Sequence, residues 1–132
     1  MGENGYVPQL WENPPRYEEK NNMSYRKERL WANEAVLKLE RAKLVREVRK
    51  EELWSVNPLM LASNSKGKKR LCLDLSRCVN QVIKAPKFRI ESTMAALQVI
   101  EKDNYLFSFD LKPAYLQVIL NENFFEVFGF WN

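Results

Sequence analysis

The chain has 132 residues, with 21 Lys and Arg against 17 Asp and Glu, and it contains no histidine. The lack of histidine excludes Ser-His-Asp and Cys-His nucleophile systems and His-ligated metals, so catalysis would need carboxylates, lysines, tyrosines or oxygen-bound metal ions. The 45% apolar fraction suits one small domain with a core. Because we find no disulfide framework, no signal-peptide pattern and no apolar run of about 18 residues, we expect an intracellular, non-secreted protein that does not cross a membrane.

Three features are predicted in the first part of the chain. Residues 1–31 combine prolines, mixed charge and scattered aromatics without a period, so we expect a poorly ordered N-terminal arm. Residues 32–50 carry apolar side chains at near-helical spacing among good helix formers, which predicts a helix. A short apolar run, a glycine-containing polar turn and the alternating sequence RLCLDL then predict a β-hairpin over residues 59–75 with a basic tip.

The second part of the chain predicts another helix and several strands. Residues 91–102 should form a helix capped by Ser92 or Thr93. The dense apolar run YLFSFDL (105–111) is typical of a buried strand, here with Asp110 near its C-terminal end. A turn at 112–115 is followed by the further strand candidates LQVIL and FFEVFGFW. The predicted fold class is therefore α+β.

The positive charge is concentrated in one segment. Residues 66–89 contain eight Lys and Arg residues and a single acid, Asp74, which gives a net charge of +7 there and −3 in the rest of the chain. Such a basic segment suits a polyanionic partner. A solvated lysine-rich turn is the simpler interpretation of the charge alone, because only Phe88 interleaves an aromatic ring with these cations.

Asp110 is the candidate catalytic residue. A carboxylate at the end of a buried strand is costly unless it is paired or binds a metal. An aspartate that merely caps the following turn is the ordinary alternative. The surrounding motif Phe-x-Phe-Asp-Leu-Lys-x-Ala-Tyr-x-Gln-Val (107–118), about 35 residues after a basic hairpin, favours the functional interpretation.

These motifs resemble the reverse transcriptases of retroelements, most of all those of tyrosine-recombinase retrotransposons and next those of long-terminal-repeat elements. Three stretches carry the resemblance: VNPLMLASNSKGKKRLCLDLSRCVNQ (56–81), KFRIESTMAAL (87–97) and FSFDLKPAYLQVILNE (107–122). In this order they are similar to the fingers strands, the fingers-to-palm segment and the first aspartate motif. The resemblance implies that residues 32–132 form a partial reverse transcriptase domain, with the fingers hairpin and the start of the palm of a right-hand polymerase.

The resemblance also implies a chemistry. In the family, nucleotidyl transfer is an in-line displacement at phosphorus stabilised by two Mg²⁺ ions, which prefer oxygen ligands. Asp110 would ligate both metals, and the carbonyl of Leu111 would add one oxygen. The implied partners are an RNA or DNA template-primer, a deoxynucleoside triphosphate and the remainder of the polymerase.

The implied nucleotide-binding residues lie in two places. Arg70 would fold over the triphosphate, where its fork of N–H donors suits phosphate oxygens. Ala114 would offer a backbone N–H to the triphosphate, and Tyr115 would lie beneath the sugar. The lysines of the hairpin tip would add phosphate contacts: Lys66, Lys68 and Lys69.

The sequence departs from the family pattern in three respects. Pro113 replaces a small residue and removes a backbone N–H. Asn64 and Ser65 stand where the family carries lysines. No aspartate follows Asp110 in this chain, and the only later acids are Glu122 and Glu126. We therefore expect a fragment that lacks the second aspartate motif and does not polymerise alone, with the apolar edges of the 105–110 strand uncovered.

Two other hypotheses stay open from the sequence. The chain could be a non-catalytic nucleic-acid-binding or interaction module that uses the basic 66–89 segment. It could also be an unrelated small α+β protein in which Asp110 is structural.

Overall fold

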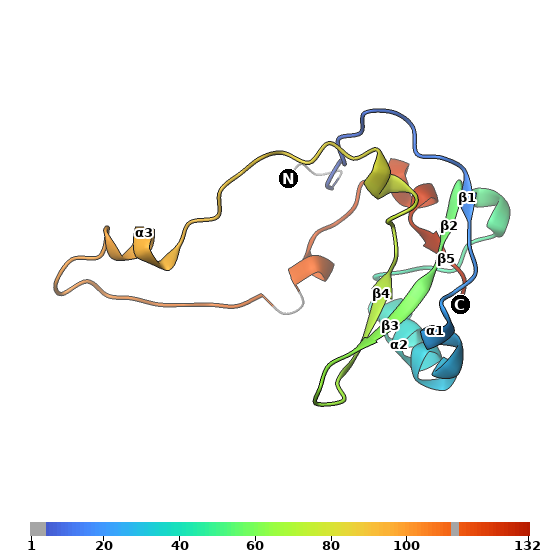
Figure 1. The fold of residues 1–132 in the computed structure, drawn as a ribbon, viewed down its shortest axis with the longest axis horizontal. Coiled ribbons are helices and arrows are strands. Elements are labelled where there is room, and N and C mark those ends of the chain that lie inside the picture. The colour runs from blue at the N-terminus through green and yellow to red at the C-terminus, as the bar shows by residue number, and fades with distance from the viewer. Residues whose placement is uncertain (1–4, 112–113) are drawn as a thin grey trace.

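The structure is a computed structural model that describes residues 5–111 and 114–132. It is a small mixed α/β domain of short strands and helices, from which one long loop projects (Figure 1). Among the described residues, no helix is long and apolar enough to cross a membrane.

The predicted hairpin is confirmed. Strands β3 (Leu59–Ser63) and β4 (Lys69–Leu73) pair antiparallel, with Leu59 opposite Leu73 and Ser63 opposite Lys69. Gly67 lies in the connecting loop with φ +77°, a left-handed conformation that glycine adopts without a steric penalty. The hairpin projects from the body with this loop at its free end (Figure 1).

Two helices pack against the hairpin and form the core. Helix α1 (Met23–Lys27) begins at Asn22, whose side chain accepts a hydrogen bond from the Ser24 amide, and helix α2 (Arg29–Arg41) follows after one residue. The buried core consists of apolar side chains from these helices and the hairpin: Tyr25, Ala32, Val36 and Leu59, flanked by Trp31, Leu71, Leu73 and Phe130. The hairpin thus uses one face for the core and leaves the other free.

The prediction of a helix over 32–50 is wrong at both ends. Helix α2 begins at Arg29 and ends at Arg41, and a separate 3₁₀ turn, η1 (Lys50–Glu52), follows later. The cause is a Schellman closure: the Leu44 amide donates to the Leu39 carbonyl, and Lys43 takes a φ of +59°. Glycine usually occupies this left-handed position and lysine rarely does, so the sequence does not mark the end of the helix.

A second, parallel sheet joins three distant parts of the chain in the order β1–β2–β5. Strand β1 (Tyr17–Glu18) pairs with β2 (Ser55–Asn57), and β2 pairs with β5 (Gly129–Phe130). The fully buried Asn57 amide donates to the carbonyls of Val127 and Gly129, which fixes β5 against β2.

The C-terminal strand predictions are wrong for most of their length. The segment predicted as LQVIL contains part of a 3₁₀ turn, η3 (Ala114–Gln117). The first half of the segment predicted as FFEVFGFW belongs to η4 (Glu122–Val127), and only Gly129 and Phe130 form a strand, β5. Asn121 precedes η4, and its side chain accepts a hydrogen bond from the Asn123 amide. This local hydrogen bond offers the backbone an alternative to a strand.

The N-terminal segment differs from the expected poorly ordered arm. Its described part, residues 5–31, contains β1, α1 and the start of α2. Tyr25 is 3% exposed, and its hydroxyl donates to Asn132 Oδ1 at 2.7 Å. Asn21 accepts from the Leu59 amide and donates to the Trp131 carbonyl. Side-chain hydrogen bonds to residues far away in the sequence therefore hold this segment against the hairpin and the C-terminal residues. Such hydrogen bonds leave no periodic pattern in the sequence.

The long loop comprises the described residues 84–111 and 114–119. After the 3₁₀ turn η2 (Val79–Gln81) the chain runs outward, forms the short helix α3 (Thr93–Leu97) and returns (Figure 1). Of the two predicted cap residues Ser92 caps α3, by accepting from the Ala95 amide, but the helix is shorter than the predicted 91–102. Its apolar side chains find no core, since Met94 is 68% exposed.

The prediction of a buried strand over 105–111 is wrong. The structure forms no strand there, and every residue from Tyr105 to Leu111 is exposed. A strand needs a neighbour for its backbone and a surface for its side chains, and the projecting loop supplies neither.

The base of the loop is held by the N-terminal segment. The Tyr6 amide donates to the Ile119 carbonyl, while the Trp11 amide donates to the Val82 carbonyl. Residues 6–11 thereby contact both legs of the loop where it leaves the body.

Candidate nucleic-acid interface

The hairpin tip is organised by Asn64. Its side-chain oxygen accepts hydrogen bonds from the amides of Lys66 at 3.0 Å and Lys68 at 2.9 Å, and its backbone carbonyl accepts from the Gly67 amide. Asparagine commonly orders turns in this way. The loop backbone is therefore fixed by Asn64, while both lysine side chains are left in solvent.

The alternation of β4 divides its cations between two faces. Leu71 and Leu73 pack against the helix core, so Lys69, two residues earlier, lies on the same face. Arg70 lies on the opposite, solvent-exposed face.

Lys69 is already engaged by the helices. Its ammonium lies 3.0 Å from Glu28 Oε2 and 5.9 Å from the ring of Trp31. Its side chain is 31% exposed. This lysine connects the hairpin to α2 and is the least available of the four predicted phosphate-binding cations.

The other three predicted phosphate-binding cations are available to an anionic ligand. Lys66, Lys68 and Arg70 are exposed, and none of them takes part in an ion pair within residues 5–111 and 114–132. Lys66 and Lys68 lie on the connecting loop, and Arg70 is the second residue of β4 on its exposed face, so the three cations are close neighbours along the chain. We call this set the tip cations.

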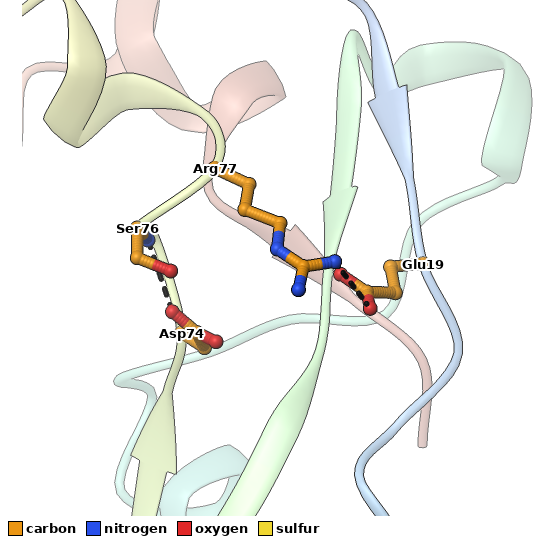
Figure 2. A network of polar contacts seen from close by, with 4 residues as sticks. All are labelled: Glu19, Asp74, Ser76 and Arg77. Atoms are coloured by element: carbon orange, nitrogen blue, oxygen red, sulfur yellow. Dashed lines mark hydrogen bonds and ion pairs between the residues drawn. The ribbon is translucent and has the colours of Figure 1, made fainter.

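The turn after β4 is held by polar contacts shown in Figure 2. The Ser76 amide donates to Asp74 Oδ1 at 3.0 Å, and Arg77 forms an ion pair with Glu19 at 3.2 Å, which links this turn to the segment after β1. Hydrogen bonds from Ser76 hold the pKa of Asp74 below its ordinary value. Asp74 is therefore an ionised turn cap, and among the described residues it forms no ion pair with the tip cations.

The residues predicted around the catalytic aspartate do not form a site in this structure. Asp110 and Leu111 lie exposed in the projecting loop, and Tyr115 is 93% exposed in η3, which begins at Ala114. The predicted turn at 112–115 includes residues 112 and 113, and these, with the Pro113 departure, lie outside the described residues. No ion pair connects Asp110 with the described hairpin cations.

The donor set around Asp110 does not by itself fit two Mg²⁺ ions. A carboxylate and a backbone carbonyl are suitable hard ligands, but a two-metal site needs several carboxylates. Over the described ranges, no three acidic or cysteine side chains come together as a metal-binding group. Further carboxylates would have to come from another segment or polypeptide.

An open groove of about 550 Å³ lies beside β1 and β2. Its cations are satisfied internally: Lys50 pairs with Glu18 at 2.9 Å, and the Arg16 guanidinium stacks over the Trp54 ring at 4.4 Å. Because its positive and negative side chains balance, it is a weaker anion site than the hairpin tip.

Sequence reasoning missed two determinants of the tip. Asn64 was noted only as a departure from lysine, although an Asn before a Ser-Lys-Gly turn is itself a turn signal. The engagement of Lys69 depends on Glu28 and Trp31, some forty residues earlier, and no local pattern predicts it. Searches of protein-family models, curated proteins and solved structures find no match to the chain.

Proposed function

We propose that this chain supplies the fingers hairpin and first aspartate motif of an RNA-directed DNA polymerase, and that alone it binds nucleic-acid or nucleotide phosphates without extending a primer. The proposal rests on the hairpin over residues 59–73, which lies in the first of the three stretches that resemble reverse transcriptases. Three cations without an ion-pair partner in the described part of the chain extend from the tip and outer face of this hairpin.

The phosphate-binding part of the proposal follows from charge and exposure. The tip cations carry three positive charges on and beside a loop fixed by Asn64, and none of them forms an ion pair with an acid among the described residues. Lysine and arginine neutralise phosphates and release counterions, which produces steeply salt-dependent binding. Arg70 adds a fork of donors suited to two phosphate oxygens.

The absence of independent polymerisation follows from the donor set. Asp110 is the single carboxylate of its motif, and this chain has no later aspartate. In the proposed enzyme, Asp110 and Leu111 would contribute oxygen ligands to two Mg²⁺ ions, with the remaining carboxylates and the complementary palm surface supplied by the remainder of the polymerase. The Mg²⁺ ions would supply charge stabilisation at the transferred phosphoryl group.

Primer extension on an RNA template tests the catalytic half. With Mg²⁺ or Mn²⁺, the purified chain should give no more DNA than an Asp110→Asn control. Synthesis above that control would contradict the expected inactivity. Sequencing the transcript beyond codon 132 tests the family assignment, because an encoded Tyr-x-Asp-Asp hairpin would support it.

A non-catalytic binding module is the second candidate, and the isolated position of Asp110 favours it. Both candidates predict that neutralising the tip cations (Lys66→Gln, Lys68→Gln, Arg70→Gln) weakens binding to a labelled RNA–DNA duplex. The matched control removes three exposed lysines elsewhere, at positions 20, 27 and 38. Equal losses in the two triple variants would refute the hairpin as the interface. A transcript without a second aspartate motif would favour the module.

A further inference from the structure

Residues 105–111 form an exposed apolar segment whose backbone is unpaired. Among the hydrogen bonds of the described residues, none involves the backbone amides or carbonyls of this segment. Its apolar side chains are 57–101% exposed: Tyr105, Leu106, Phe107, Phe109 and Leu111. Segments with this composition and free backbone groups are templates for strand pairing with another chain.

The side chains already alternate as they would in a strand. The rings of Phe107 and Phe109 stack with centroids 6.4 Å apart and an interplanar angle of 17°, so residues two apart share one side. Tyr105, Phe107, Phe109 and Leu111 therefore define an apolar face, and Leu106, Ser108 and Asp110 define the other.

We propose that this segment pairs antiparallel with the same segment of a second copy, centred on Ser108, to form a homodimer. This register uses all seven residues. It places Phe107 of one copy opposite Phe109 of the other, and Tyr105 opposite Leu111, on one apolar face. Aromatic and apolar cross-strand pairs of this kind stabilise a sheet.

Charge selects the antiparallel direction. In a parallel, in-register pair, Asp110 would lie beside Asp110 of the other copy, and like charges on neighbouring strands are destabilising. In the antiparallel register each Asp110 lies opposite Leu106, so the two carboxylates stay apart. This inference does not depend on the polymerase proposal.

The area available is close to what a dimer needs. Aromatic side chains bury about 150–250 Å² each, so the exposed Tyr105, Phe107 and Phe109 alone offer on the order of 500 Å² per copy, and the two exposed leucines bring the total nearer the roughly 800 Å² of a standard interface. Two strands alone are marginal. Other exposed apolar side chains of the same loop can add to the contact: Phe88, Ile90, Met94 and Val99. The dimer should therefore dissociate on dilution.

Sedimentation analysis over a wide concentration range tests the assembly. The wild-type chain should approach twice its 15.7 kDa mass at high concentration. Phe107→Lys should stay at the single-chain mass, with an unchanged far-UV spectrum and urea midpoint because Phe107 is 88% exposed. A wild-type chain that is monomeric throughout, or that forms only large aggregates, would overturn the proposal.

A cysteine trap tests the register. In a Cys72→Ser background, with Cys78 buried, Ser108→Cys places two thiols at the centre of the pair, within disulfide reach. The control Asn104→Cys places its two thiols roughly 25 Å apart in this register. Ser108→Cys should give a disulfide-linked dimer on mild oxidation and Asn104→Cys should not. Equal crosslinking of both variants would refute the register.

Discussion

Two neighbouring lysines of the hairpin should respond to the same substitution in opposite ways. Lys68 lies on the tip and forms no ion pair among the described residues, whereas Lys69 contacts Glu28 and the ring of Trp31. Lys68→Gln should weaken nucleic-acid binding and leave stability unchanged. Lys69→Gln should lower the free energy of unfolding and alter binding less.

The magnitudes follow from these contacts. A partly exposed ion pair contributes about 0.2–1 kcal/mol, and an exposed cation–π contact about 0.5–1 kcal/mol. Losing both should cost Lys69→Gln about 1 kcal/mol. With a urea dependence of about 2 kcal/mol per M, the unfolding midpoint should fall by roughly 0.5 M. A lysine that neutralises one phosphate contributes about 0.7–0.9 to the slope of log affinity against log salt, so Lys68→Gln should lower the slope by that amount.

Two assays on the same samples separate the outcomes. Urea unfolding monitored by tryptophan fluorescence gives the midpoint, and anisotropy of a labelled RNA–DNA duplex across a salt series gives the slope. Lys38→Gln, an exposed lysine of α2 without an ion pair among the described residues, is the control and should change neither quantity. If Lys69→Gln leaves the midpoint unchanged while reducing the slope as much as Lys68→Gln, the division of the hairpin cations into engaged and free groups is wrong.

Three further predictions concern strand β5, the loop of the hairpin and the turn that follows the hairpin. Gly129→Ala should destabilise the fold by about 1–3 kcal/mol, because an added Cβ would lie 2.9 Å from the backbone oxygen of Ser55, which cannot move aside as the Leu53 side chain can; an unchanged thermal midpoint would contradict this packing. Gly67→Ala should cost about 1–2 kcal/mol through its positive φ alone, since no atom lies near an added Cβ, and urea unfolding would measure it. Hydrogen bonds from Ser76 depress the folded-state pKa of Asp74, so its contribution to stability is present above its ordinary pKa of 3.8 and is lost as the pH falls through the depressed value. Compared with Asp74→Ala, the wild type should be more stable at neutral pH and should lose that advantage in acid; a constant difference across pH would refute the role.

The parts of the fold that sequence reasoning predicted correctly are local. The hairpin could be predicted because both strands, their alternation and the turn glycine lie within seventeen residues. The Ser92 cap was likewise readable from neighbouring residues. The basic segment was evident from charge alone, but only the family resemblance singled out its four hairpin cations as phosphate-binding, and neither signal distinguished Lys68 from Lys69.

The missed features depend on distant partners or on an atypical residue. The apolar run 105–111 indicates a segment that gains by burial, but whether it is buried depends on a surface that the loop does not reach. Helix α2 ends at Arg41 and is closed by a left-handed Lys43, where helix propensity predicts continuation. Strands β1, β2 and β5 have two or three residues each, which is too short for a period to emerge.

The parallel sheet has a consequence for the order of folding. Its pairings connect residues 17, 55 and 129, whereas the hairpin closes over a few residues. Long-range pairings must overcome a larger loop-closure entropy before they gain contacts, so we expect the hairpin and helices to associate first and the sheet to close last. Until β5 docks, the buried Asn57 amide has neither carbonyl partner. Docking of β5 supplies both hydrogen-bond partners. We therefore expect the Asn57 side chain to stabilise the native chain relative to a collapsed chain in which β5 is not yet paired.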